Sequence, residues 1–185
     1  MNLQDHQQEI CRAYVRGGPG AIVSGTIWLI AAITAAYGGL ARGFAVLFFG
    51  GMLIFPISRL LVAMLFRRPS ESPGNPGGLI VMETVVPMIG GLFAAWLLLP
   101  VCPTCVFPVA AIAVGAHYFG FRTAYGDGTY WVFGGLLCLW GTLSVITGLP
   151  SAPAVPFWVA GTEFVFGIWF LLADRADSRA PSVDG

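Results

Sequence analysis

The stretch Gly20–Leu40 reads GAIVSGTIWLIAAITAAYGGL and contains no charged residue. A helix needs about 20 mainly apolar residues to cross a bilayer, so this stretch is long enough for one crossing. A signal peptide has a shorter apolar core behind a basic leader, whereas the tail before this stretch mixes acidic with basic residues: Asp5, Glu9, Arg12 and Arg16. We therefore predict an uncleaved membrane-spanning helix.

Five further apolar runs follow in the 185 residues, of which 57% are apolar and only 10% are charged. Soluble domains carry about 25% charged residues, so a soluble fold is excluded. The runs predict an all-α, polytopic bundle of six spans over residues 20–173: Gly20–Leu40, Gly43–Phe66, Leu79–Pro100, Thr104–Phe121, Thr129–Leu149 and Val155–Ala173. The fourth span begins among prolines, so its outer turn is expected to be irregular or re-entrant. Five spans plus a half-helix is the competing count.

Arginine supplies all nine basic residues and sets the expected orientation, because cytoplasmic loops retain positive charge. In a six-span arrangement only Arg42 falls on one side, Arg59 lies within a span, and seven fall on the other side: Arg12, Arg16, Arg67, Arg68, Arg122, Arg175 and Arg179. This asymmetry predicts a cytoplasmic N-terminal tail over residues 1–19 and a disordered cytoplasmic tail over residues 174–185. The links near Arg42, Cys102–Cys105 and Pro150–Pro156 then face outward.

The N-terminal tail places Leu3, Ile10 and Tyr14 on roughly one face of a helix. This pattern suits a short helix on the membrane surface, and a loosely ordered tail is the alternative. The longest interior link, residues 67–78, is rich in Pro, Gly and Ser and is expected to be flexible.

Several function classes find no support in the sequence. There is no nucleotide-binding loop, metalloprotease motif, kinase motif set or Ser/His/Asp order, and no tightly bound organic cofactor is indicated. Nine acidic residues balance the nine basic ones, which gives no reason to expect nucleic acid as a partner. A non-enzymatic role is favoured, and any function must lie in the bundle or in what the bundle binds.

Glycine and proline predict how the helices pack. Small residues four apart, such as Gly91 and Ala95, let helix backbones approach closely. Pro56 and Pro87 lie inside the second and third spans and are expected to kink them. Gly-Gly pairs recur in apolar settings, at Gly50, Gly90 and Gly134, which is attributed to chance similarity rather than to an internal repeat.

Ionisable residues in a span are functional candidates by default, because burying them in hydrocarbon is costly. Arg59 and Glu83 lie at similar depths, about 10 Å and 6 Å from the same membrane surface. We expect an ion pair that closes the hairpin of spans two and three, with snorkelling of Arg59 as an alternative. His117 and Arg122 approach the same surface, and the four side chains together suggest a site for an anion or a lipid headgroup.

Glu163 is predicted to lie near mid-membrane in the sixth span, with small residues, Ala160 and Gly167, on its helix face. No arginine is expected at that depth, so desolvation favours the protonated carboxyl. This is a feature of proton-coupled carriers and also of a structural buried hydrogen bond.

Cys102 and Cys105 flank Pro103 and Thr104 in a Cys-x-x-Cys pair at the outer end of a span. The spacing suits a disulfide or shared binding of a soft metal, and a purely structural pair is the third possibility. Cys138 and Cys11 are too distant in predicted depth to join this pair.

Three sequence runs resemble a family of small uncharacterised bacterial multi-pass membrane proteins. They are residues 117–126 (HYFGFRTAYG) followed by Tyr130 and Trp131, residues 23–29 (VSGTIWL) and residues 47–56 (LFFGGMLIFP). The resemblance implies a bacterial inner-membrane protein and supplies no activity. The cysteine pair is not expected to belong to the family's pattern.

Three functional hypotheses follow from these residues. The first is a small carrier or permease-like protein that uses Glu163 and a layer formed by Arg59, Glu83 and His117. The second is a thiol-redox membrane protein that uses Cys102 and Cys105. The third is a non-catalytic accessory or scaffold subunit, which binds a membrane protein or a second copy of itself.

Overall fold

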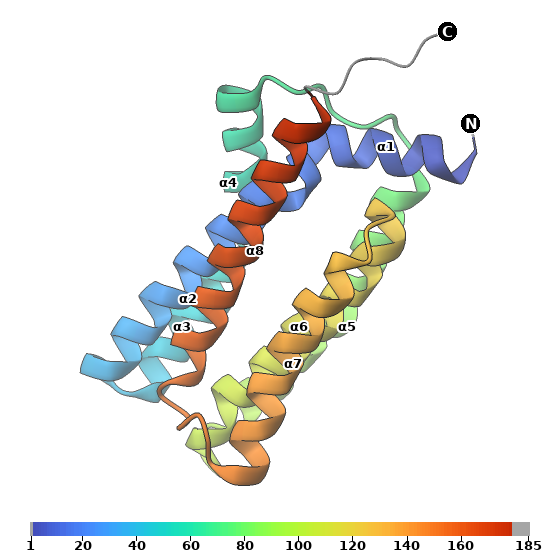
Figure 1. The fold of residues 1–185 in the computed structure, drawn as a ribbon. Coiled ribbons are helices and arrows are strands. Elements are labelled where there is room, and N and C mark those ends of the chain that lie inside the picture. The colour runs from blue at the N-terminus through green and yellow to red at the C-terminus, as the bar shows by residue number, and fades with distance from the viewer. Residues whose placement is uncertain (1, 179–185) are drawn as a thin grey trace, which may run out of the picture.

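The structure, a computed structural model, describes residues 2–178, and every regular element within that range is helical. Eight α-helices follow one another along the chain (Figure 1): α1 Leu3–Tyr14, α2 Gly18–Gly38, α3 Leu40–Gly51, α4 Ile54–Leu61, α5 Pro76–Leu97, α6 Val106–Tyr125, α7 Thr129–Thr147 and α8 Val155–Asp177. A 3-10 turn, Val15–Gly17, joins α1 to α2; a π-helical segment, Val62–Phe66, extends α4; and a second 3-10 turn, Pro103–Cys105, precedes α6.

Five of the helical segments are long and apolar enough to cross a membrane, and α3 with α4, bent by 51° at their junction, gives a sixth when the pair is counted as one span. Large apolar side chains are exposed along the spans, for example Met82, Val86 and Phe93 on α5. A lipid environment solvates such surfaces, whereas water would not. The prediction of a polytopic helical membrane bundle is confirmed.

The bend between α3 and α4 has a local cause. Pro56 has no N–H to donate to the carbonyl of Met52, the residue that directly follows α3. The helix therefore breaks around Met52 and Leu53, where the backbone forms a turn instead. In contrast, α5 continues through Pro87 as one helix from Pro76 to Leu97.

The helix ends differ in places from those expected. α8 runs to Asp177, so residues 174–177, assigned above to a disordered tail, are helical; residues 179–185 lie outside the described residues. The N-terminal tail forms the helix α1, and the side chain of Ile10 in this helix is buried against the bundle. The irregular turn expected before the fourth span is present at Pro103–Cys105.

The spans form two groups of three. α2 packs mainly on α3 and α8, and α6 packs mainly on α5 and α7. We call α2, α3–α4 and α8 the first trio and α5, α6 and α7 the second trio. The trios touch chiefly through α7 and α8, with smaller contacts from α6 to α8 and α3. Figure 1 shows them as two adjoining groups of parallel or antiparallel helices with α1 lying across one end.

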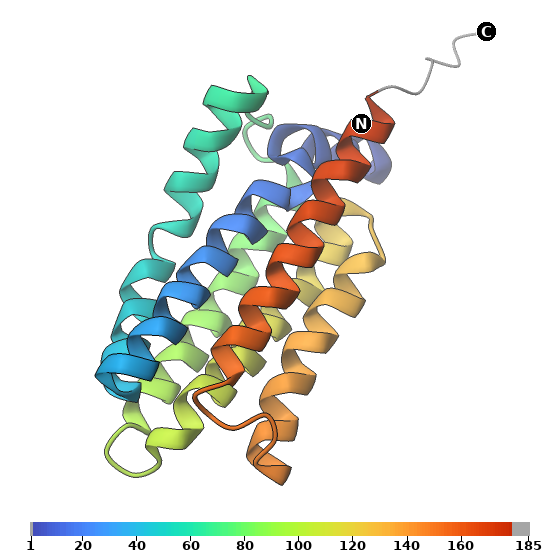
Figure 2. The same cartoon turned by 60° about the vertical axis from the view of Figure 1, so that its left-hand side comes forward.

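The two ends of the bundle differ in charge. The α1 end contains α1, the segment 67–75, and the ends of α6 and α8, and both ends of the described chain lie there (Figure 2). Six of the seven arginines expected on one side belong to this end, and Arg179 lies outside the described residues. The opposite end, which we call the disulfide end, contains the α2–α3 and α7–α8 connections and Cys102–Cys105.

Glycines hold α6 and α7 together at close range. A Cβ atom built on Gly134 would lie 2.5 Å from the carbonyl oxygen of Gly115, and one on Gly115 would lie 2.6 Å from the carbonyl oxygen of Gly134. Only hydrogen side chains allow the two backbones to approach this closely, which is the general mode of tight helix packing in membranes.

We expect Gly134→Ala to destabilise the protein by about 1–3 kcal/mol, because the methyl group overpacks the α6–α7 contact. Gly135→Ala is the matched control, since a Cβ atom there meets nothing within 4 Å. The free energy of unfolding in detergent micelles measures both effects. Equal free energies of unfolding for the two variants would contradict this expectation, because they would show that the α6–α7 contact accommodates a methyl group.

Candidate functional site

Glu163 on α8 lies between helices of both trios. Its side chain is completely buried, at 0% exposure, and the Tyr118 hydroxyl of α6 donates a hydrogen bond of 3.2 Å to its Oε1. Its Oε2 is buried and has no hydrogen-bond partner among the described residues. Oε1 is therefore the oxygen of this carboxyl group that the described residues bind by a hydrogen bond.

Small residues create the space that this carboxyl group occupies. A Cβ atom on Gly25 of α2 would lie 3.2 Å from the Cβ of Glu163, so only glycine lets α2 pack closely there. The buried Ser24 lies beside the Tyr118–Glu163 pair. Gly167, one turn along α8, faces Ile22 of α2, so the small-residue face of α8 points inward, as the sequence predicts.

The surroundings of this pair are aromatic. The ring of Tyr118 lies 4.1 Å from that of Phe133, centroid to centroid, and Phe133 stacks on Phe166 at 4.7 Å. No ion pair of the described residues includes Glu163. Glu163 therefore lies in an apolar layer with hydroxyl groups as its polar neighbours.

The expected ion pair between Arg59 and Glu83 is wrong. Arg59 donates to Ser70 and to the carbonyl of Ala13, and its guanidinium lies 4.9 Å from the ring centroid of Tyr14. Glu83 is exposed on α5. Equal depth in the membrane did not bring the side chains together, because α4 and α5 belong to different trios.

His117 and Arg122 do not join Arg59 either. The His117 ring nitrogen Nδ1 lies 2.8 Å from the Thr84 hydroxyl of α5, so this histidine links α5 to α6. Arg122 lies over the ring of Trp131, 5.8 Å from its centroid. The layer of Arg59, Glu83 and His117 is therefore not assembled.

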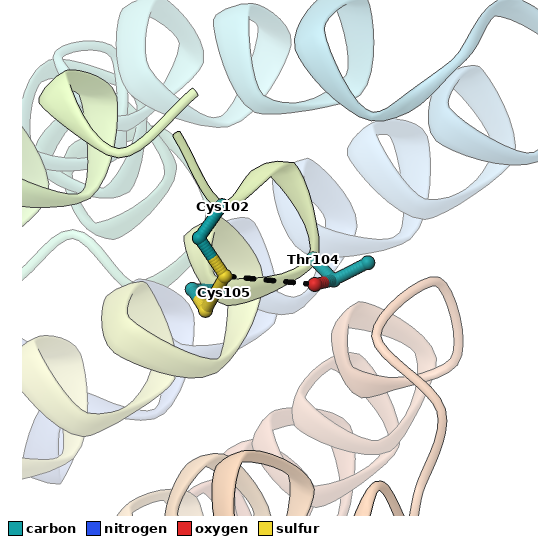
Figure 3. Close-up of a disulfide and its surroundings, with 3 residues drawn as sticks. All are labelled: Cys102, Thr104 and Cys105. Carbon is teal, nitrogen blue, oxygen red and sulfur yellow. Dashed lines mark hydrogen bonds between the residues drawn. A yellow bond between two sulfur atoms is a disulfide. The ribbon is translucent and has the colours of Figure 1, made fainter. Parts of the chain in front are cut away.

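Cys102 and Cys105 form a disulfide directly before α6 (Figure 3). Both residues are partly exposed at the disulfide end, and the Cys102 sulfur lies 3.6 Å from the Thr104 hydroxyl. In this oxidised form the sulfurs are not thiolates, the form that binds soft metals. Cys11 and Cys138 are free thiols elsewhere in the bundle.

A family profile matches residues 3–173, which include every span. The chain belongs to the family of unknown function DUF7010. The expectation that it resembles a family without an assigned activity is confirmed. No curated protein and no solved structure matches the chain.

The α1 end also holds a polar network that sequence reasoning missed, and two of its residues, Asp174 and Asp177, lie beyond the part of the chain that the DUF7010 profile matches. Arg16 pairs with Asp127 at 3.1 Å and with Asp177 at 2.5 Å, and Arg68 pairs with Asp174 at 3.2 Å. These partners are more than 100 residues apart in the sequence. The only sequence signal for the network is the collection of charges that flank the spans.

Glu9 fixes the segment 67–75 to α1. Its carboxylate accepts hydrogen bonds from the Ser72 backbone and hydroxyl at 2.9 and 2.5 Å, and from the Asn75 amide at 2.5 Å. Hydrogen bonds from the Ser72 hydroxyl, and then from Asn75, lower the pKa of Glu9 below its ordinary value of 4.5. The link expected to be flexible is therefore held at this point.

Because the pKa of Glu9 is lowered, the ionised carboxylate stabilises the attachment of segment 67–75 to α1 at neutral pH. This stabilisation is lost as the pH falls through the pKa of Glu9, below 4.5. We expect Glu9→Gln to raise hydrogen exchange in residues 67–75 about fivefold at neutral pH. Hydrogen-exchange mass spectrometry measures this, with Glu83→Gln, a change at an exposed carboxyl, as the control. Exchange unchanged by Glu9→Gln would contradict the assignment.

Proposed function

We propose that this protein is a small carrier of the bacterial cytoplasmic membrane that binds and releases a proton at Glu163. The observation that carries the proposal is the fully buried carboxyl group between the two trios, with Oε1 bonded to Tyr118 and Oε2 without a protein partner. Ionisable groups at this depth are rare and are characteristic of proton pathways.

The chemistry of the site follows from the cost of charge in an apolar layer. An ionised carboxylate there loses its hydration, and the Tyr118 hydroxyl offers only one hydrogen bond in return. A proton on Oε2 removes the charge. The ionised form therefore favours arrangements that admit water, and the protonated form favours the closed packing of the trios.

The arrangement of spans supports movement around Glu163. The first span, α2, packs on the second, α3–α4, and on the sixth, α8. The fourth span, α6, packs on the fifth, α7, and on the third, α5. The first span of each set of three therefore packs on the second span of its own set and on the third span of the other set. Because three is odd, the second set crosses the membrane in the opposite sense. Carriers built in this way expose a central site alternately by rocking one bundle against the other.

The distribution of arginine supports a cytoplasmic location for the α1 end. Arg42 is at the opposite end, whereas Arg12, Arg16, Arg67 and Arg68 are at the α1 end. Positive charge is retained on the cytoplasmic side during insertion, so both termini are proposed to be cytoplasmic.

Infrared titration of the purified protein in lipid tests the proton site. We expect a carbonyl band of a protonated carboxylic acid that changes with pH and is absent in Glu163→Gln. Glu83→Gln, which removes an exposed carboxyl of another span, should leave that band in place. In proteoliposomes with an imposed pH gradient, Glu163→Gln should abolish protein-dependent proton movement reported by an internal pH dye.

A carboxyl band insensitive to pH, or one that survives Glu163→Gln, would show that Glu163 is a structural hydrogen-bonding group. Proton movement equal in Glu163→Gln and in the unaltered protein would reject the carrier. Correct folding of each variant is checked by its elution as a single species in detergent.

A second candidate function is thiol–disulfide exchange at the disulfide end, favoured by the Cys102–Cys105 bond. A thiolate of a partner dithiol would attack one sulfur, form a mixed disulfide and release the other as a thiolate. The partner's second thiol then closes the partner's disulfide. Two electrons and two protons pass from the partner to Cys102 and Cys105.

Labelling of intact cells with a membrane-impermeant maleimide tests this candidate. We expect labelling of Cys102 and Cys105 only after reduction, and labelling of Cys105 without reduction in Cys102→Ser. Cys11, at the opposite end, should stay unlabelled and serves as the control. Labelling of the unaltered pair without reduction would show free thiols and reject a resident disulfide.

A further inference from the structure

The turn between α1 and α2 has an unusual backbone. Val15 and Arg16 both have positive φ, at 51° and 50°, followed by Gly17 at 78°. The left-handed region is uncommon for residues other than glycine and is strained for a β-branched valine. Such a turn persists only where its surroundings hold it in place.

The side chain and the carbonyl of Arg16 both help to hold this turn in place. Its guanidinium joins Asp127, in the α6–α7 connection of the second trio, and Asp177, the last residue of α8 in the first trio. Its carbonyl accepts a hydrogen bond of 2.7 Å from the Tyr130 hydroxyl of α7. One residue therefore ties the α1–α2 turn to both trios.

α1 itself is attached to both trios. The Gln7 amide donates to the carbonyl of Thr123 at 2.8 Å, and the Cys11 thiol donates to the carbonyl of Tyr125 at 3.3 Å, both on α6 of the second trio. From the first trio, Arg59 of α4 donates to the carbonyl of Ala13. α1 is a strap across the boundary between the trios.

A cavity of about 580 Å³, open to the surface, lies next to this strap. Its lining combines glutamines and charged groups from α1, the turn, α6 and α8, including Gln8, Cys11, Arg16, Tyr125, Asp174 and Asp177. The amide and charged groups of this lining offer hydrogen bonds to a small polar solute.

A column of buried aromatic rings separates the cavity from the buried carboxyl group. Tyr125, in the cavity wall, lies 5.1 Å from Tyr130 between ring centroids, and Tyr130 stacks on Tyr118 at 6.4 Å. Tyr118 donates to Glu163. The cavity and Glu163 therefore lie at the two ends of one line of tyrosines.

We propose that this cavity is the entrance to the Glu163 site for small hydrophilic solutes, and that α1 is its gate, held closed by Arg16. The inference rests on the proposed function, because it takes Glu163 as the place to which the entrance leads. The gate opens when Arg16 leaves Asp127 and the strap releases α6.

Cys11 is a natural reporter of this opening. It lines the cavity, and its thiol is bonded to α6 while the gate is closed. Burial raises the pKa of Cys11 from 9.0 to about 11, and the thiolate is the form that reacts with maleimides. Release of α1 exposes this thiol and increases its rate of reaction.

The experiment measures the rate of N-ethylmaleimide labelling at each cysteine of the purified full-length protein by mass spectrometry. We expect Arg16→Gln to accelerate labelling at Cys11 about tenfold. Cys138 on α7, distant from the gate, is the internal reference and should keep its rate. Arg42→Gln, which removes an arginine at the disulfide end, is the matched control and should change neither rate.

An unchanged rate at Cys11 in Arg16→Gln would overturn the gate. If both cysteines accelerate in that variant, Asp127→Asn decides, because it weakens the clamp and leaves Arg16 in place. Selective acceleration at Cys11 in Asp127→Asn then supports the gate, and its absence overturns the gate. None of these rates depends on proton binding by Glu163, so failure of the gate is distinguishable from failure of the carrier.

Discussion

The buried carboxyl of Glu163 is the constraint around which the rest of the bundle is arranged. Within residues 2–178, its bond from Tyr118 is the one fully buried hydrogen bond between side chains of different helices. It joins α8 of the first trio to α6 of the second. Gly25 leaves room for it, and the aromatic layer around it keeps water away from the group. Any rearrangement of the trios changes the environment of this one carboxyl.

The long apolar helices could be predicted from the sequence, because an apolar run of about 20 residues is long enough for one crossing. The burial of Glu163 inside the bundle could also be predicted, because its helix face carries small residues. The inward face of α8 was also predictable, since Ala160 and Gly167 are small and small residues mark close helix contacts. The pairing of Arg59 with Glu83 failed because depth does not fix which way a side chain points. Glu83 faces outward from α5, and Arg59 belongs to the opposite trio.

The α1 end could not be predicted for a different reason. Its ion pairs join residues more than 100 positions apart, and no local pattern links Arg16 to Asp127 or Asp177. The turn at Val15 and Arg16 even opposes local preference, since neither residue favours positive φ. Tertiary contacts select this conformation. The two-trio packing could not be predicted either, because an apolar run indicates which segment crosses the membrane but not which helices it packs against.

The two ends of the boundary between the trios differ in how they resist opening. At the disulfide end, aromatic side chains of opposite trios pack together: Phe107 lies 6.4 Å from Trp28, and Phe44 lies 5.8 Å from Trp96, between ring centroids. Each such side chain buries about 150–250 Å² of surface, so separating them exposes a large apolar area. At the α1 end the boundary is aromatic as well, since Tyr130 of α7 stacks on Phe170 of α8 with 4.5 Å between ring centroids. This end carries in addition the partly exposed ion pairs of Arg16, which contribute about 0–1 kcal/mol each. Water replaces ion-pair partners far more easily than it solvates aromatic rings. The ion pairs are therefore the part of the boundary that yields most easily, and the aromatic contacts at both ends hold the two trios together.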